Sequence, residues 1–510
     1  MPRGSRDQLS ARGGDDALVV VLMAVTMVAG IISSLGAPLI PSVARTLHIP
    51  LDSAQWSLTV ALLSGAISAP IMGRLGDGPR RRETIIGGLL IVFTGSIVAG
   101  LAHSLIVLVA GRAMQGVGLG LAPVTMAAAR DHLPESRSPG VIAILSVCGA
   151  AAVGAGYPFS GLIDSDLGLH AAFLFGAVIS GSALAAAAKV IPSNRHAAAG
   201  SIDLVGALMI TLGLIALLLA ISQGQQWGLD SPAVVTLGLI ALLTLASWAR
   251  LQLHRRSPLV DLRQLGHRAV LTADLAAIVL GIAMYMFLTL VTEFMQEPRS
   301  GGYGFGSSSL VAGLSLVPFS IISLLASRTI RRISRQVSDS AILVAGSLLI
   351  AASGAFFALE HSHEWEAFVT MGGVGAGFGY TFAAIPGMIT RAVPPRETGS
   401  AMGLYQVIRY VGFSLGSAIA ASILAGYTID HGHTVLQGGY VNALWVGTGI
   451  CALSAVTSGL LTARDRPVDP GARDGSFLRN LAVEDAELAS AGLVGIEGEG
   501  VPRQHNVNGA

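Results

Sequence analysis

The sequence predicts an all-α integral membrane protein with fourteen transmembrane helices, and three observations support this. Apolar residues make up 52% of the 510 residues and charged residues only 12%, and the mean hydropathy of +0.67 exceeds that of soluble domains. Apolar runs of about 20 residues follow one another from Ala17 to Ala463. Basic residues gather in every second connection between these runs. The runs leave no room for a soluble catalytic domain.

Each apolar run is long enough to cross roughly 30 Å of hydrocarbon as a helix. The expected spans cover residues 17–41, 54–73, 84–103, 104–129, 139–163, 169–191, 203–222, 232–249, 269–292, 307–327, 338–359, 365–390, 398–427 and 436–462. The seventh and eighth spans are separated only by GQQWGLDSP, which carries turn residues and no basic residue.

The distribution of basic residues tests this count, because short cytoplasmic loops collect Arg and Lys. With the N-terminus inside, all but four of the 31 basic residues fall in cytoplasmic segments. The exceptions are Arg45 and Arg299 in external loops, and Arg112 and Arg409 within spans. A missed or extra span would reverse the pattern beyond it. We therefore expect both termini on the cytoplasmic side of a bacterial cell membrane.

The connection between the second and third spans reads GRLGDGPRRRE, residues 73–83. Topology alone explains its arginines, but it explains neither the aspartate nor the closely spaced glycines. The segment resembles the loop 2/3 signature of the major facilitator superfamily, and the resemblance is carried by Gly73, Asp77, Arg81 and Arg82. Two positions depart from the family pattern. The family has a basic residue where this chain has Gly78, and a glycine where this chain has Arg80.

Three further segments resemble motifs of the same family. In the fourth span, GRAMQGVGLG matches at Arg112, Gln115, Gly116 and Gly118. In the fifth span, VGAGYPFSGLI resembles the antiporter motif through Gly156, Pro158 and Gly161, with the proline one position late and Ser160 in place of a glycine. Residues 399–419 resemble the thirteenth span of the fourteen-span drug:proton antiporter branch, with Arg409 and Gly412 in place.

The resemblance implies a major facilitator fold of two six-helix bundles, with substrate bound near the midplane and alternating access. The expected divisions are a cytoplasmic N-terminal tail (1–16), a first bundle (17–191), two inserted helices with a cytoplasmic linker (192–268), a second bundle (269–463) and a cytoplasmic tail (464–510). Because the last segment is rich in Gly, Asp, Glu and Ala, we expect it to be disordered.

Asp77 is the candidate cytoplasmic gate residue. A carboxylate at a helix terminus can accept backbone N–H groups and pair with nearby arginines. The resemblance implies that this aspartate and an arginine hold the outward-facing state, with the arginine reaching an acid at the cytoplasmic end of the fourth span. Asp131 is the expected acid, and Arg81 or Arg80 the expected donor. The alternative is a solvated loop whose charges only set topology.

Arg112 lies at a depth where a charge costs several kcal/mol unless it is paired or hydrated. We expect it to face a central cavity, together with Gln115 on the same helix face. The resemblance links the arginine at this position to proton coupling and substrate binding. The alternative is a buried arginine that bridges helices by capturing backbone carbonyls. Arg409 is either a second cavity residue or a brace between helices.

An acid is missing from the first span, where many members of the drug-exporting branch carry an aspartate. The segment AGIISSLGAPLIP offers Ser33 and Ser34 instead. Asp274, in the ninth span, becomes the candidate protonatable acid for proton coupling. It can equally be a helix-start acid that accepts hydrogen bonds. This absence weakens any expectation of a cationic substrate.

The ninth span contains MYMF, in which Met284, Tyr285 and Phe287 can line a pocket for lipophilic substrates, because Met and aromatic side chains adapt to varied shapes. The alternative is lipid-facing packing for any two of the four. The only lysine, Lys189, follows no phosphate-binding loop, so no Walker-type ATPase is expected. We expect no metal site and no cofactor, with protons as the coupling ion.

The leading hypothesis is a secondary active transporter, a multidrug-type exporter that exchanges lipophilic or amphiphilic molecules for protons. An alternative is a dedicated carrier of a metabolite, lipid or siderophore, without proton coupling, which the missing first-span acid favours. A non-transporting sensor or scaffold is a third class, but no soluble domain is appended. We expect no enzymatic activity, a monomer in the lipid bilayer, a small-molecule substrate, no nucleic acid and no ATPase subunit.

Overall fold

The computed structural model describes residues 3–35, 39–49, 51–193, 203–228, 230–255, 258–334, 336–394, 397–429 and 434–462. The predicted C-terminal tail, 464–510, lies outside these ranges. Residues Met1–Gly459 form one compact unit, and Leu460–Ala510 are assigned to another.

The first half of the bundle runs to residue 190. Its elements are α1 (Arg3–Ser34), α2 (Ile40–Leu47), α3 (Leu51–Gly76), α4 (Arg81–Gly100), α5 (Leu105–Gly116), the 3₁₀ helix η2 (Val117–Gly120), α6 (Leu121–His132), α7 (Ser138–Leu167) and α8 (Leu169–Val190). A middle segment contains α9 (Leu204–Trp227), α10 (Pro232–His254) and η3 (Leu262–Gly266).

The second half begins at residue 268. Its elements are α11 (Arg268–Gln296), η4 (Arg299–Gly301), α12 (Ser309–Leu314), α13 (Leu316–Ile333), α14 (Asp339–Leu359), α15 (Glu364–Ala392), α16 (Thr398–Gly426) and α17 (Gln437–Thr462). Between the last two helices, β1 (Thr428–Ile429) and β2 (Thr434–Val435) form a two-stranded antiparallel pair. The all-α prediction is confirmed apart from this short pair.

Thirteen helices in the described residues are long and apolar enough to cross a membrane. They coincide with thirteen of the fourteen expected spans. The remaining span, 139–163, falls within α7, a helix of 30 residues. Among the described residues, its apolar stretch Ser138–Gly149 is shorter than a membrane span. The total of fourteen therefore stays a prediction.

Several expected boundaries were wrong, for local reasons. The first helix ends at Ser34, and a separate α2 follows with Pro41 in its first turn, since proline cannot donate to a preceding turn. Helix α1 also begins at Arg3, so the chain is helical through most of the predicted tail, although the stretch that can span the membrane starts at Asp15, two residues from the expected start. The expected fourth span is interrupted by η2 at the glycines of GVGLG, and the tenth is divided at Ser315.

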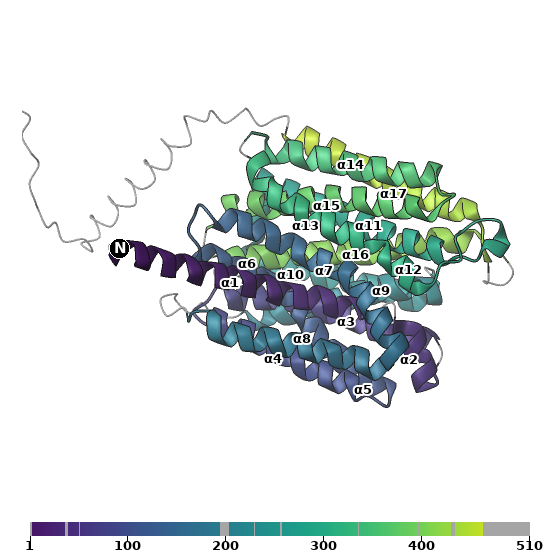
Figure 1. Ribbon diagram of the computed structural model, residues 1–510, viewed down its shortest axis with the longest axis horizontal. Coiled ribbons are helices and arrows are strands. Elements are labelled where there is room, and N and C mark those ends of the chain that lie inside the picture. The colour runs from purple at the N-terminus through teal and green to yellow at the C-terminus, as the bar shows by residue number, and fades with distance from the viewer. Residues whose placement is uncertain are drawn as a thin grey trace, which may run out of the picture. The chain divides into compact units, whose positions relative to one another are not determined.

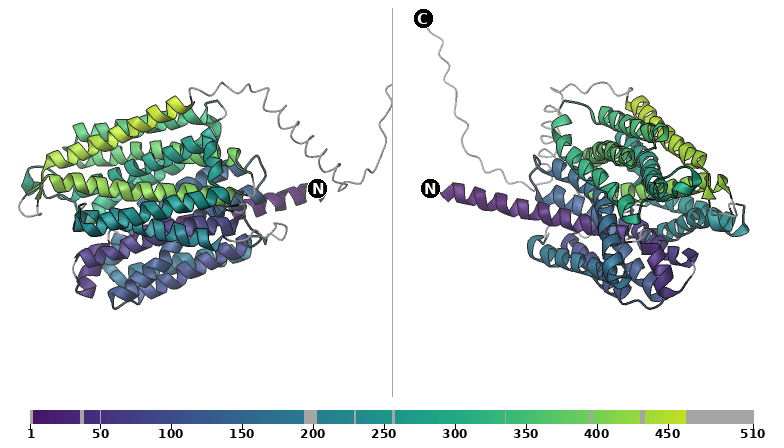
Figure 2. Two further views of the ribbon diagram at one scale, coloured as in Figure 1. Left: turned by 180° about the vertical axis from the view of Figure 1, so that it is seen from behind. Right: turned by 45° about the vertical axis from the view of Figure 1, so that its right-hand side comes forward.

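The helices lie side by side in one bundle (Figures 1 and 2). The most extensive contacts between the halves are those of α3 with α16 and of α7 with α13. Helix α9 packs on α3 and α16, and α10 packs on α9. The inserted pair thus lies beside one junction between the halves. Asp203, the N-cap of α9, joins the two inserted helices, because it accepts a hydrogen bond from Gln252 of α10 (2.9 Å) and pairs with Arg255 (2.9 Å).

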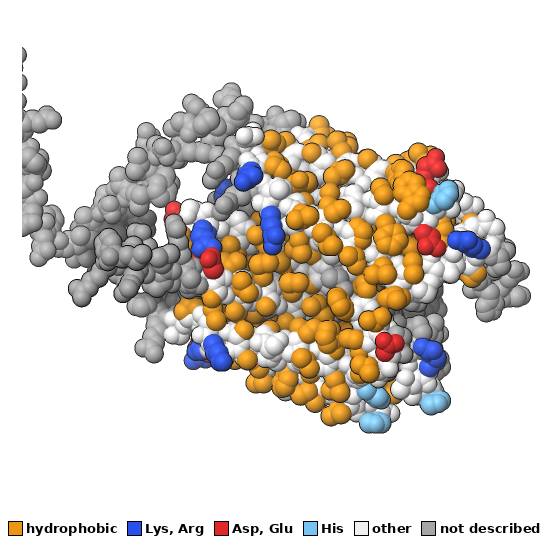
Figure 3. All heavy atoms as spheres, viewed as in Figure 1, with side chains coloured by type: hydrophobic (Ala, Val, Ile, Leu, Met, Phe, Trp, Pro, Cys, Tyr) orange, Lys and Arg blue, Asp and Glu red, His pale blue; other side chains and the backbone are white. Residues whose placement is uncertain are grey.

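The surface carries an apolar belt between two polar ends (Figure 3). On α10, Leu239, Leu242 and Leu243 are 54–66% exposed, as expected for helices that face lipid. We call the end that carries Arg74, Arg80–Arg82, Arg137 and Arg391 the arginine-rich end. The other end, which carries α2, η4 and the strand pair, is the far end.

Candidate functional site

The arginine-rich end is closed by a direct contact between the two halves. Asp77, just after α3, accepts hydrogen bonds from the backbone N–H groups of Gly399 (2.6 Å) and Ser400 (2.8 Å). These groups belong to the first turn of α16, where backbone donors have no partner within the helix. The backbones also approach closely, because a Cβ atom added at Gly73 would lie only 2.4 Å from the carbonyl oxygen of Gly399.

The arginine behind this contact is Arg81, one of the two expected donors. Its guanidinium pairs with Asp131 and donates to the carbonyl of Gly76 (2.5 Å). Arg80 is exposed and occupies the N-cap position of α4. The structure therefore brings Arg81 and Asp131 together as predicted, whereas the gating role of this cluster stays a prediction.

Sequence reasoning missed Arg130, which neighbours Asp131 and makes a second contact across the halves. Its side chain donates to the Thr398 hydroxyl (2.5 Å) and to the carbonyl of Val393 (3.1 Å). Its position among the charges of AAARDHLPESR was the available signal, but the charges were assigned to topology and to Asp131 alone.

Closure changes the acidity of Asp77. Burial raises the pKa of this carboxyl to about 6, and the opposing effects of the Ser400 and Gly399 N–H groups and of Arg81 do not cancel the rise. In water an aspartate has a pKa of about 4. Asp77 therefore binds a proton more tightly when this end is closed than when it is exposed.

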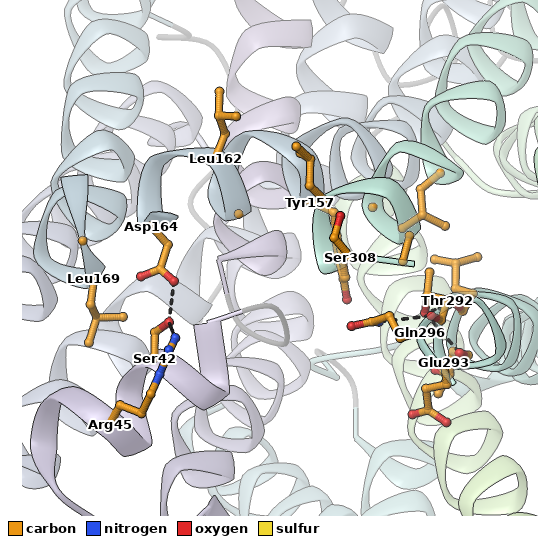
Figure 4. Close-up of a pocket in the computed structure, with 18 of the residues that line it drawn as sticks. Ser42, Arg45, Tyr157, Leu162, Asp164, Leu169, Thr292, Glu293, Gln296 and Ser308 are labelled. Atoms are coloured by element: carbon orange, nitrogen blue, oxygen red, sulfur yellow. Dashed lines mark hydrogen bonds between the residues drawn. The ribbon is translucent and has the colours of Figure 1, made fainter. Parts of the chain in front are cut away.

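The far end is hollowed by a cavity of about 1030 Å³, the far-end cavity. Figure 4 shows Ser42, Arg45 and Asp164 of the first half on one side and Thr292, Glu293 and Gln296 of α11 on the other. Asp164 accepts a hydrogen bond from Ser42, which in turn accepts one from Arg45 (3.0 Å). Because Arg45, Glu293 and Gln296 are exposed, the cavity is open to solvent at this end.

A smaller cavity of about 50 Å³, the central cavity, lies deeper between the halves. Its lining comes from α1, α3, η2, α6 and α7 in the first half and from α11 and α16 in the second: Thr26, Ala29, Gly30, Leu62, Leu119, Ala122, Leu145, Gly149, Tyr157, Met284, Tyr285, Leu288, Gln406, Arg409, Tyr410 and Phe413. Three of these residues, Tyr157, Tyr285 and Leu288, also line the far-end cavity. The two cavities therefore adjoin.

Arg409 is the charged residue of the central cavity. It lies eleven residues into α16, a 29-residue helix, which places it near the middle of a bilayer of roughly 30 Å. Its guanidinium donates to the carbonyl of Ser146 in α7 (3.3 Å) and to the hydroxyl of Tyr405 (3.3 Å). Arg409 thus both lines the cavity and bridges the halves, so the two interpretations of its sequence position are compatible.

Arg112 is fully buried within the first half. It donates to the carbonyls of Ser57 (3.0 Å) in α3 and Ile32 (3.2 Å) in α1, and to the side chain of Gln115 (2.7 Å). Gln115 continues the network to the hydroxyl of Ser96 in α4 (3.0 Å). Neither Arg112 nor Gln115 lines the two cavities described above. These contacts are those of the helix-bridging alternative, and coupling by Arg112 stays a prediction.

Asp274 lies in the second turn of α11 and is 5% exposed. Its Oδ1 atom has no hydrogen-bond partner among the described residues. The helix-start alternative required accepted hydrogen bonds, and the structure shows none at this oxygen. A buried carboxyl with an unpartnered oxygen is costly to keep charged, which suits a group that gains and loses a proton.

The fifth-span residues lie along the junction of the halves. Gly161 lines the far-end cavity. Pro158 lies inside α7 opposite Gly313 of α12, where an added Cβ would be 3.5 Å from the proline nitrogen. Gly156 is buried in the same helix. This segment of α7 therefore contacts the second half directly beside the cavity.

The ninth-span residues divide into two groups. Met284 and Tyr285 line the central cavity, whereas Phe287 is fully buried against Gly354 and Gly447 inside the second half. Met286 is also fully buried. The expectation that two of the four face lipid was wrong, because α11 is enclosed by other helices of the bundle.

The cavity residues that were not singled out from the sequence include Tyr157, Gln406, Tyr410 and Phe413. The last three share a helix face with Arg409, at i, i+3, i+4 and i+7 positions. A polar and aromatic stripe at this spacing in an otherwise apolar span was the signal that could have found them.

Two helical halves that enclose a cavity open at one end have the arrangement that alternating-access transporters use. A model of the Major Facilitator Superfamily matches residues 22–417. The chain therefore belongs to the Major Facilitator Superfamily, whose members are transporters.

Similar proteins include a multidrug resistance protein and an export protein. The chain is 26% identical to the multidrug resistance protein Stp of Mycobacterium tuberculosis, covering 76% of this chain and 72% of Stp. It is 27% identical to the cephamycin export protein CmcT of Amycolatopsis lactamdurans, covering 85% and 89% of the two chains. The human organic anion transporter MFSD10 (TETRAN) has the same fold, with a TM-score of 0.59 at 15% identity over 87% of this chain and 99% of that one.

Proposed function

We propose that this protein is a secondary active exporter that exchanges lipophilic or amphiphilic small molecules for protons by alternating access. The observation that carries the proposal is the central cavity, which both halves line and which adjoins an open far-end cavity while Asp77 closes the arginine-rich end. A site between two halves, accessible from one end, is what alternating access requires. The similarity to the multidrug resistance protein Stp and to the cephamycin export protein CmcT supports export.

The charge distribution supports an orientation of the protein that suits export. Short cytoplasmic loops collect Arg and Lys, so the arginine-rich end faces the cytoplasm and the far end faces outward. The structure then corresponds to an outward-open state in a bacterial cell membrane. A molecule released from the central cavity in this state leaves through the far-end cavity.

Proton coupling is assigned to Asp274 with a contribution from Arg112. Asp274 supplies a buried oxygen without a partner, and a buried ionisable group within a membrane span is a functional candidate. Arg112 connects α1, α3 and α5, so a change in its hydrogen bonds would be transmitted to three helices of the first half.

A dedicated carrier without proton coupling is the second candidate. The described residues that line the central cavity include no carboxylate, and Asp274 is not among them. Because the acid lies outside the cavity, a substrate bound there does not compete with a proton for the same site. This separation favours a carrier without proton coupling.

The test uses purified protein in vesicles with an acidic interior, loaded with a pH-sensitive dye. Cationic dyes, neutral lipophiles and organic anions are added in turn to wild type and to Asp274→Asn, Arg112→Ala and the control Asp230→Asn, which replaces an exposed acid. Substrate-dependent proton release that persists in the control and is lost in Asp274→Asn and Arg112→Ala supports the proposal. Substrate uptake without proton release in wild type would leave only the uncoupled carrier.

A further inference from the structure

We propose that the central cavity binds the anionic head group of an amphiphilic or aromatic substrate, and that Arg409 is the residue that recognises it. The proposal rests on the function proposed above and specifies its substrate class. It starts from the lining of the central cavity, in which Arg409 is the only charged side chain among the described residues.

Arg409 has no acidic partner among the described ion pairs. It is 4% exposed, and its Nε atom has no hydrogen-bond partner in the described part of the chain. Its recorded acceptors are one carbonyl and one hydroxyl at 3.3 Å, both neutral and both at the long end of the hydrogen-bond range. A buried charge in a membrane protein is costly unless it is paired. An anionic ligand would supply the missing counter-charge.

Four aromatic rings surround the guanidinium, with centroids 5.3–5.8 Å from its central carbon: Phe382, Tyr405, Tyr410 and Phe413. Contacts with ring faces stabilise the cation and hold its plane in place. A planar guanidinium held in this way is preorganised for a carboxylate or sulfonate, which it can bind through two parallel hydrogen bonds.

The rest of the lining suits a molecule with a polar head and an apolar body. Gln406 adds an amide whose Oε1 atom has no partner among the described residues, and Tyr285 stacks on Phe413 with centroids 5.4 Å apart. The cavity of about 50 Å³ has room for a head group or a few water molecules. The body would extend past Tyr157 and Leu288 into the far-end cavity.

The acids of the far-end cavity do not compete with this assignment. Asp164 is engaged by Ser42, and Glu293 lies eight residues beyond Tyr285 on α11, about 12 Å along the helix. A cationic head would instead meet the positive charge of Arg409 in the central cavity. The charges therefore favour an anion at the inner position.

The test is equilibrium binding to the purified full chain in neutral-lipid nanodiscs, with protein-free nanodiscs subtracted. Three probes share one aromatic body and differ in head group: pyrenebutyrate, pyrenebutanol and (pyrenylbutyl)trimethylammonium. Wild type is compared with Arg409→Gln, Arg409→Lys and the control Arg332→Gln, which removes an exposed arginine. We expect wild type and control to bind pyrenebutyrate at least about tenfold more tightly than the other two probes.

Arg409→Gln should abolish this preference while leaving pyrenebutanol affinity within about twofold, and Arg409→Lys should retain part of it. A purely bracing arginine would weaken all three probes equally, which would overturn the proposal. Equal or tighter binding of the cation by wild type would also overturn it, whether or not the variants fold. The assay needs no proton gradient, so an anion preference without proton exchange would reject the proposed coupling and keep this inference.

Discussion

At the scale of single residues, Asp77 connects acidity to the closed arginine-rich end. Its carboxylate holds the first turn of α16, and burial raises its pKa to about 6. The neighbouring charges are Arg81 paired with Asp131, Arg130 bound to Thr398, and Glu397 bound to Gln264. Protonation of Asp77 is therefore linked to the position of α16.

We expect acid to favour the closed arginine-rich end. The pKa of Asp77 is higher in the closed end than in water. The contribution of Asp77 to the stability of the closed end is therefore fully present below about pH 4, the pKa of an exposed aspartate, and is lost as pH rises through about 6. Spin labels at Arg80 and Arg332, both exposed, should therefore report a larger closed fraction at pH 5 than at pH 7.5, a range that brackets the pKa of about 6. The native cysteines are buried and should label slowly.

The matched variants are Asp77→Asn, which cannot titrate, and Glu83→Gln, which removes an exposed acid in the first turn of α4. The pH response should disappear in Asp77→Asn and persist in Glu83→Gln. A response of equal size in Asp77→Asn would assign the linkage to another group.

At the scale of elements, closure depends on the close approach of α3 and α16. An alanine at Gly73 would place its Cβ 2.4 Å from the Gly399 carbonyl oxygen, whereas the space around Gly87 of α4 is open within 4 Å. The helices cannot keep this distance if a methyl group is added on the contact face.

We expect Gly73→Ala to open the arginine-rich end. Overpacking of this kind costs about 1–3 kcal/mol, which shifts a two-state population roughly 5- to 150-fold. The distance between labels at Arg80 and Arg332 should lengthen in Gly73→Ala and stay unchanged in Gly87→Ala. Identical distances in the two variants would show that the glycine contact does not control closure.

The positions of most helices along the chain could be predicted, because the length and apolar composition of a segment determine whether it can span a membrane. Length and hydropathy placed most of the spans to within a few residues, the end of the first span being an exception, and the arginines gave a consistent alternation of loops. The break at η2 and the division at Ser315 were not predictable, since apolar composition continues through both. Helix α2 (Ile40–Leu47) was missed because its first two residues fall at the end of the expected first span, and the rest, including Arg45, was assigned to an external loop.

The site was less predictable, since it depends on how the helices are rotated and on which half faces which. Asp77, Arg81 and Asp131 were found because they lie close to helix ends in readable motifs. The donors to Asp77 are backbone groups 322 residues away in the chain, and no side-chain pattern marks them. Arg112 and Arg409 carry equal charge in apolar spans, and only the packing shows that Arg409 lines the central cavity.

At the scale of the whole molecule, one end of the bundle is closed and the other is open. Helix pairs α3–α16 and α7–α13 run along the junction of the halves. The contact at Asp77 closes one end, while the far-end cavity of about 1030 Å³ separates the halves at the other. If the halves move as rigid bodies, opening one end must close the other.

The most direct test measures both ends in one protein by double electron–electron resonance. One label pair sits at Arg80 and Arg332, and a second at the exposed far-end residues Asp166 and Glu360. In Gly73→Ala, we expect the first distance to lengthen and the second to shorten relative to wild type and Gly87→Ala. A far-end distance that stays fixed, or lengthens together with the first, would contradict alternating access through this cavity.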